Sequence, residues 1–296
     1  MPTERLSLDT LNAATPAAFV AALGDIFEHA PWVAEAAAAA RPFAGVADLH
    51  AAMMAAVAAS APETQVAFLK GHPDLAGKAA RAGAMAPASV SEQAGLGLDR
   101  LSDAEYDEFQ RLNAAYRAKF GIPYIVCVRR QTRDAVLDGY RRRLAHDEAQ
   151  EIAAALDEIG HITRLRLADR VEGPGMPVVA GHLSTHVLDS YHGVPAEGVA
   201  LALYEVGRSG RAKLVEAVTN ANGRTDAPLL GGAPLRAGRY ELVFGLDAYF
   251  RGKGVALPDI PFLGAVTIAF GIDAPEGRYH VPLVATPWSY STYRGS

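Results

Sequence analysis

Cysteine is almost absent from this sequence, with one residue among 296. A single thiol excludes a disulfide framework and any metal site built from several thiolates. Long apolar runs are absent too, since no stretch approaches the roughly 20 residues of a membrane span. Positive charge is in slight deficit, with 28 Lys and Arg against 33 Asp and Glu, a formal net charge of −5. Neither nucleic acid nor a membrane is therefore an expected partner.

A secretory signal is also missing, because Met1–Thr10 carries Glu4 and Asp9 and has no apolar core. The last residues are not a Ser-Lys-Leu peroxisomal signal, so we expect a cytoplasmic location. Apolar residues, in contrast, make up 50% of the chain and charged residues 21%. This balance excludes a disordered chain, and the length suggests two domains.

Glycine and proline are scarce in the first part of the chain. Residues 1–170 contain 10 of the 28 Gly and 8 of the 18 Pro, whereas the shorter remainder contains the other 18 Gly and 10 Pro. This asymmetry predicts two different folds in one chain. A Gly/Pro stretch at 172–177 reads as a short connection. We therefore expect a domain over 1–171, a linker over 172–178 and a second domain over 179–296.

The first part has the composition of an all-α helical bundle. Alanine is abundant from Thr15 to Ala61 and has the highest intrinsic helix propensity. Prolines favour first turns and break helix interiors. They are expected to divide this stretch into short helices at Pro16, Pro31, Pro42 and Pro62.

Two further helices are predicted beyond residue 100. Ser102 and Glu105 form a capping box that begins a helix ending at Gly121. A last long helix is expected from near Thr132, because apolar residues recur there with helical period. Its apolar stripe comprises Val136, Tyr140, Leu144, Ile152, Ala155, Ile159 and Ile162.

Some features of this part allow both a structural and a functional interpretation. His72 lies in a turn between two glycines and beside Pro73, which suits a solvated turn or a catalytic loop. Ser89 and Glu92 have capping-box spacing, yet Glu92 and its neighbour can also face a cleft. The apolar segment 120–128 is expected to be extended, as a buried connector or a backbone lining for a ligand.

Arg166 continues the apolar stripe of the last helix, so the helix turns an arginine toward its buried side. An unpaired buried charge is costly, and the guanidinium therefore needs an anionic partner. That partner is either a structural Asp or Glu or the carboxylate of a substrate, held by two parallel hydrogen bonds.

Together these motifs resemble the family of 2-oxo-4-hydroxy-4-carboxy-5-ureidoimidazoline (OHCU) decarboxylases. The similar segments are GHPDLAGK (71–78), SVSEQAGLGLDRLSDAEY (89–106), LNAAYRAKFGIPYIVCV (112–128) and EIGHITRLRLADRV (158–171). The resemblance implies that His72 is the catalytic histidine and Glu92 its acid/base and orienting partner. It also implies a set of substrate-binding residues: Pro73, Ser89, Gln93, Ile122, Tyr124, Ile125, Val126 and Arg166.

The implied reaction needs no cofactor and no metal. Loss of CO2 leaves electron density that the ring imine or carbonyl accepts, and a histidine near neutral pKa can carry the proton. Protonation from one side gives one enantiomer of allantoin.

The second part changes from a period of 3.6 to a period of 2. Apolar residues alternate around 199–204, 240–246 and 266–270, and further strands are expected at 213–219 and 278–285. Gly, Pro and Asn separate these strands, which predicts an all-β sandwich. His182 and His186 are four apart on a strand, about 13 Å, too far for one zinc ion. No metal site is expected.

The segments HLSTHVLD (182–189) and YSTYRGS (290–296) resemble the 5-hydroxyisourate hydrolases, a transthyretin-related family. Binding-only transthyretins lack the final Tyr-Arg-Gly-Ser. The resemblance implies a transthyretin-like sandwich whose active sites form at the subunit interfaces of a tetramer. Its implied catalytic residues are His186, Arg224, His280 and Ser296, and its implied substrate-binding residues are Tyr293, Arg294 and Gly295.

Chemistry suggests how these residues divide the work of amide hydrolysis. One histidine activates water as a general base, and Arg224 stabilises the oxyanion. Which histidine is the primary base stays open.

Joined, the two resemblances imply two consecutive steps of urate breakdown in an oligomer with dimeric helical and tetrameric β parts. The partners are then small-molecule substrates. Two alternatives remain: a fusion with one active domain, and a transthyretin-like carrier fused to a helical interaction domain.

Overall fold

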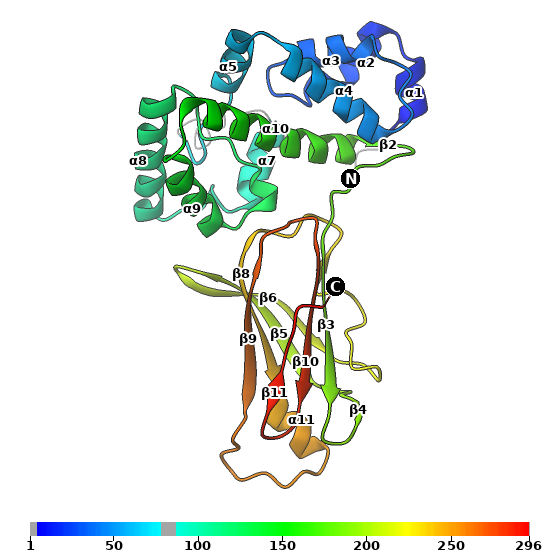
Figure 1. The fold of residues 1–296 in the computed structure, drawn as a ribbon, viewed down its shortest axis with the longest axis vertical. Coiled ribbons are helices and arrows are strands. Elements are labelled where there is room, and N and C mark those ends of the chain that lie inside the picture. Colours follow the sequence, from blue (N-terminus) through cyan, green and yellow to red (C-terminus); the bar gives the residue numbers. More distant parts are fainter. Residues whose placement is uncertain (1–4, 78–86, 296) are drawn as a thin grey trace. The chain divides into compact units, whose positions relative to one another are not determined.

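The chain forms two compact units in a computed structural model that describes residues 5–77 and 87–295. The helical unit comprises Met1–Arg129 and Val136–Val179, and the β unit comprises Arg130–Ala135 and Ala180–Ser296. Each unit has its own hydrophobic core. The predicted order, helices first and a strand-rich part second, is confirmed (Figure 1).

Helices form nearly all of the first part of the chain. Prolines occupy the first turns of three of them, as predicted. The helices are α1 (Leu8–Ala13), α2 (Pro16–Leu23), α3 (Pro31–Ala38), α4 (Val46–Ala59), α5 (Pro62–Lys70), α7 (Pro87–Gly95), α8 (Asp103–Phe120), α9 (Arg133–Arg143) and α10 (Glu148–Arg170), with a 3₁₀ turn, η1, at Val128–Arg130. Two short strands, β1 (Leu6–Ser7) and β2 (Val171–Glu172), pair in parallel.

The predicted capping box of α8 is confirmed, and Gly121 ends the helix in the left-handed conformation with φ of 68°. The predicted single helix from Thr132 is wrong, because α9 ends at Arg143 and α10 starts anew. A second capping box causes the break: the Asp147 side chain accepts from the Gln150 amide at 2.8 Å, and the Gln150 side chain accepts from the Asp147 amide at 3.0 Å.

Backbone hydrogen bonds join part of the predicted Gly/Pro linker to the helical unit. The Val46 and Ala47 amides donate to the carbonyls of Pro174 and Gly175 at 3.0 and 2.9 Å. These bonds satisfy amide groups in the first turn of α4 that have no partner within the helix. A Cβ on Gly45 would lie 3.1 Å from the Gly175 Cα, so this close approach favours glycine.

Two sheets form the β unit, as predicted. One has the order β11 (Tyr290–Ser291), β10 (Arg278–Ala285), β3 (His182–Asp189), β4 (Val194–Pro195), with β7 (Leu230–Gly231) also paired to β3. The other has the order β6 (Gly210–Val218), β5 (Ala200–Gly207), β8 (Gly238–Gly245), β9 (Ala265–Ile272). Strands β3 and β10 run parallel, and buried and partly exposed residues alternate along β3.

The alternation predicted through Leu246 ends one residue early. Leu246 begins α11 (Leu246–Gly252), which the sequence analysis missed. Its buried residues Leu246, Tyr249 and Phe250 have helical spacing. Leu246 therefore packs into the core as part of a helix and not of a strand.

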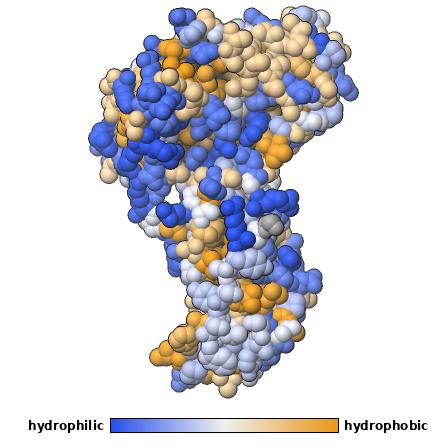
Figure 2. All heavy atoms as spheres, viewed as in Figure 1, coloured by the Kyte–Doolittle hydropathy of each residue, from blue (hydrophilic) through white to orange (hydrophobic). Residues whose placement is uncertain are grey.

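The visible face shows hydrophilic and hydrophobic residues side by side, with a broad moderately hydrophobic area over the helical unit (Figure 2). The β unit exposes several large apolar side chains, among them Ile260 at 90%, Phe262 at 77% and Trp288 at 53%. Within the part of the chain that the structure describes, no helix has the length and apolarity to span a bilayer.

Candidate functional sites

One pocket of the helical unit collects residues from segments far apart in the sequence. Of the site residues predicted in the helical unit, all but Ile122 line it. The lining comprises Glu28 before α3, His72, Pro73 and Leu75 after α5, Ser89, Glu92 and Gln93 of α7, Tyr124, Ile125, Val126 and Val128, and Ile162 and Arg166 of α10. Glu28, Leu75, Val128 and Ile162 were not predicted.

Arg166 is the centre of the charged groups in this pocket. Its side chain is 9% exposed and holds Glu92 through two parallel bonds, Nε to Oε1 at 2.9 Å and Nη2 to Oε2 at 2.8 Å. Nη2 also donates to the Ser89 hydroxyl at 3.1 Å. The structural carboxylate partner is therefore present, and it lies on α7.

Ser89 is not a helix cap, because α7 begins at Pro87 and Ser89 lies inside it. Its hydroxyl donates to Glu28 Oε2 at 2.5 Å. The capping-box interpretation of Ser89 and Glu92 is thus wrong, and both side chains belong to the polar cluster of the pocket.

His72 follows the end of α5 in the predicted turn. Its Nδ1 lies 3.0 Å from the Phe68 carbonyl oxygen. A carbonyl only accepts, so the proton of the neutral ring is on Nδ1 and the lone pair on Nε2. Burial lowers the pKa of His72, while the nearby charge of Glu28 raises it. Glu92 bonds Arg166 and no bond joins it to His72 among the described contacts.

Glu28 is the polar residue that the sequence analysis missed. It lies in the turn between α2 and α3 and is 5% exposed. Its Oε1 is buried and has no hydrogen-bond partner within the described residues. The available signal was one of two acidic residues, Asp25 and Glu28, that flank the apolar Ile26 and Phe27 in a stretch otherwise rich in alanine.

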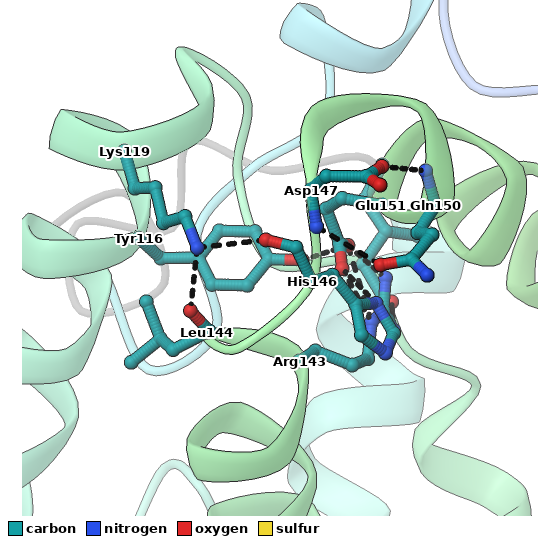
Figure 3. A network of polar contacts seen from close by, with 9 residues as sticks. Tyr116, Lys119, Arg143, Leu144, His146, Asp147, Gln150 and Glu151 are labelled. Carbon is teal, nitrogen blue, oxygen red and sulfur yellow. Dashed lines mark hydrogen bonds and ion pairs between the residues drawn. The ribbon is translucent and has the colours of Figure 1, made fainter.

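The segment 122–128 is buried but forms no strand. One buried and one half-buried charged group fix its backbone. Arg143 Nη1 donates to the Ile125 carbonyl at 2.7 Å, and Glu158 accepts from the Cys127 amide at 2.8 Å. Arg143 in turn binds the fully buried Glu151, which also accepts from Tyr116 and contacts His146 (Figure 3).

A second cluster lies on the first sheet of the β unit. His186 on β3 and His280 on β10 occupy neighbouring parallel strands, with His280 opposite Ser184. Residues 184 and 186 share one face of the strand, so both histidines face the same side. The Ser184 hydroxyl lies 3.0 Å from His280 Nδ1. His186 Nε2 is buried and has no hydrogen-bond partner among the described residues.

Arg224 follows the turn at 220–223, and its backbone forms an isolated antiparallel β-bridge with His186. The Asn220 side chain accepts from the Arg224 amide at 3.2 Å. Gly223 has φ of 70°, and a Cβ there would lie 2.3 Å from the Val187 carbonyl oxygen. Burial and the charge of Arg224 lower the pKa of both His186 and His280.

The C-terminal segment lies against His280. The Gly295 amide donates to the His280 carbonyl at 3.0 Å, and a Cβ on Gly295 would lie 2.7 Å from the His280 ring. Tyr293 and Arg294 line a pocket with His280, and the Arg294 guanidinium lies 5.0 Å from the centre of the Tyr279 ring. The predicted Ser296 lies outside the described residues.

Comparison with known proteins matches both units. Residues 12–168 match the model of the OHCU decarboxylase family, and residues 183–295 match that of the HIUase/Transthyretin family. A Haloferax volcanii OHCU decarboxylase is 43% identical over 165 residues, which are 56% of this chain and 96% of that protein. A Deinococcus radiodurans 5-hydroxyisourate hydrolase is 53% identical over 120 residues, 40% of this chain and all of that protein.

One solved structure spans both units. The crystal structure of an (S)-allantoin synthase aligns with a TM-score of 0.54 and 34% identity, covering 98% of this chain and 100% of that one.

Proposed function

Since the chain belongs to the OHCU decarboxylase family over residues 12–168 and to the HIUase/Transthyretin family over residues 183–295, we propose that it catalyses two consecutive steps of urate breakdown. The β unit hydrolyses 5-hydroxyisourate to OHCU, and the helical unit decarboxylates OHCU to (S)-allantoin. The observation that carries this proposal is that each unit gathers its family's candidate residues around one place. We assign the activities to 1–171 and 179–296, with 172–178 as the linker.

Hydrolysis of 5-hydroxyisourate needs a base and an oxyanion partner. A lowered pKa keeps His186 and His280 neutral near pH 7, which makes either ring a base for the attacking water. Arg224 stabilises the oxyanion, because its positive charge stands beside both rings. Tyr293, Arg294 and Gly295 bind the substrate, and Ser296 completes the site.

Decarboxylation of OHCU needs an oriented carboxylate and a proton carrier. Ser89, Gln93 and Arg166 orient the ring substrate. His72 carries the proton through Nε2, since its Nδ1 is held by Phe68. The apolar side chains of the pocket, Leu75, Val128 and Ile162, disfavour the localised charge of a carboxylate. When neutral CO2 leaves, that charge passes to the ring imine or carbonyl, and the proton from His72 neutralises it.

Two full-length variants test the assignment with freshly generated 5-hydroxyisourate. Ultraviolet absorbance follows both intermediates and circular dichroism follows the enantiomer of allantoin. The His72→Ala variant should accumulate OHCU, and the His186→Ala variant should leave 5-hydroxyisourate to decay at its uncatalysed rate. Each variant is the folding control for the other, because its second activity should persist.

The alternatives predict different results. A fusion with one active domain loses activity in only one variant. A binding module fused to a helical interaction domain accelerates neither step in the wild-type chain. Either result contradicts the two-step proposal.

The exposed apolar residues of the β unit, such as Ile260 and Phe262, support a homo-oligomer. We assign it a tetrameric β part and a dimeric helical part. Light scattering of the full chain measures the mass, and a monomer would contradict this assignment.

A further inference from the structure

The helical pocket contains an acceptor without a donor. Glu28 is 5% exposed, and its two carboxyl oxygens differ sharply in their surroundings. Oε2 accepts from the Ser89 hydroxyl at 2.5 Å and lies 3.6 Å from Arg166 Nη2. Oε1 is buried with no hydrogen-bond partner in the described part of the chain. A buried acceptor left unpaired destabilises the folded chain, so its retention needs an explanation.

Neighbouring groups hold Glu28 in this position. The turn that carries it is tied to α10, because the Ile26 carbonyl accepts from Arg166 and Arg170 pairs with Asp25 at 2.9 Å. The next residue, His29, has φ of 56°, a left-handed conformation that few residues other than glycine adopt. Such local strain is unfavourable and is concentrated at functional sites. The turn is therefore fixed around the carboxyl group.

We propose that Glu28 is a substrate-binding residue of the decarboxylase site, whose Oε1 accepts an N–H donor of the bound ureidoimidazoline. This inference rests on the proposed decarboxylation. Glu28 and His72 line the same pocket, and the polar groups around Glu28 leave only Oε1 free. A ureido group supplies N–H donors that need an acceptor once water is excluded. Glu92 already bonds the Arg166 guanidinium. The group left over in this cluster is therefore an acceptor, which suits the neutral N–H donors of the ureido group.

The charge of Glu28 also acts on His72, which gives a second readout. The charged and titratable groups that face His72 are Glu28, Arg166 and His29, with Glu92 lining the same pocket. Glu28 favours the protonated ring, whereas Arg166 and His29 oppose it. Removing the charge of Glu28 therefore moves the titration of His72 to lower pH.

Steady-state decarboxylation by the full chain tests the proposal with two variants. Glu28→Met removes the acceptor, and kcat/KM for OHCU should fall about 10- to 100-fold, the range expected for one unmet hydrogen bond. Glu28→Gln replaces one acceptor oxygen by an NH2 donor, so it accepts from Ser89 or from the substrate but not from both. Its kcat/KM should therefore also fall, and the pH limb of His72 should move to lower pH. Glu35→Gln makes the same chemical change at an exposed position of α3 and should behave as wild type.

Every outcome bears on the proposal. A kcat/KM of Glu28→Met within twofold of wild type overturns it, whether or not the limb moves in Glu28→Gln. Should Glu28→Met fail to fold, the more conservative Glu28→Gln decides, and a kcat/KM within twofold of wild type contradicts the role. Failure of the wild-type chain to accelerate decarboxylation would instead contradict the proposed function. Hydrolysis of 5-hydroxyisourate should be unchanged in all variants.

Discussion

Two histidines and one arginine define the β-unit site at the scale of single residues. Burial and the charge of Arg224 lower the pKa of His186 and His280 below the usual 6.5. A general base works in its neutral form, so the base stays available at a pH where an ordinary histidine is protonated. The acid limb of kcat/KM for 5-hydroxyisourate hydrolysis should therefore lie below pH 6.5.

Arg224→Gln should change this profile in two ways. Loss of the oxyanion partner lowers kcat, by about 100-fold if it acts like other such donors. Loss of the positive charge raises the pKa of both histidines, so the acid limb moves to higher pH. Arg211→Gln is the matched control, since Arg211 is half-exposed and pairs with Glu241 at 3.3 Å. If the acid limb stays in place in Arg224→Gln, the charge of Arg224 does not act on the pKa of the two histidines.

Sequence patterns predicted most elements but not their interruptions. The stripe from Val136 to Ile162 has one period, yet Asp147 begins a new helix because its side chain satisfies amide groups that continued helix would have bonded. Ser89 and Glu92 have the spacing of a cap, but tertiary partners, Glu28 and Arg166, take both side chains. Local spacing cannot reveal such partners, because they lie 61 and 74 residues away.

A buried ion pair connects helices α9 and α10 to the lining of the helical pocket. Arg143 and Glu151 contact each other (Figure 3). Arg143 is 6% exposed, Glu151 is fully buried, and Arg143 also donates to the Ile125 carbonyl. Arg143→Met leaves a buried carboxyl group without its cation. Breaking such a pair costs about 3–5 kcal/mol. We expect that loss in the free energy of unfolding of the helical unit, and a higher KM for OHCU because the lining at Ile125 loosens.

A double variant separates stability from positioning. Arg143→Met with Glu151→Leu removes the carboxyl group but also the acceptor of the buried Tyr116 hydroxyl. Only part of the stability should therefore return, while KM stays raised because Ile125 still lacks its donor. Arg141→Met, at a more exposed neighbouring position, should change stability by no more than about 0.5 kcal/mol. Urea titration and steady-state kinetics measure both effects. A wild-type KM in the double variant would show that Arg143 serves stability alone.

At the scale of the whole molecule, the uneven glycine and proline content predicted two folds, and the change of period from 3.6 to 2 predicted their classes. Both followed from local chemistry: helices exclude Gly and Pro from their interiors, whereas short strands need turns. The site residues depended on more distant information. Glu28 could be assigned to the pocket only from the fold, in which the turn before α3 contacts α7 and α10.

Because each unit has its own core, the two activities should be lost independently on unfolding. Leu49 and Leu242 are both 0% exposed, one in each core. Replacing a buried Leu by Ala costs about 2–5 kcal/mol. Leu49→Ala should therefore lower the urea concentration at which decarboxylation is lost and leave that for hydrolysis unchanged, and Leu242→Ala should do the reverse. The two variants are matched controls in one assay, since each makes the same substitution. If either variant moved both midpoints equally, the units would unfold as one cooperative body, and the separate cores would not correspond to separate stabilities.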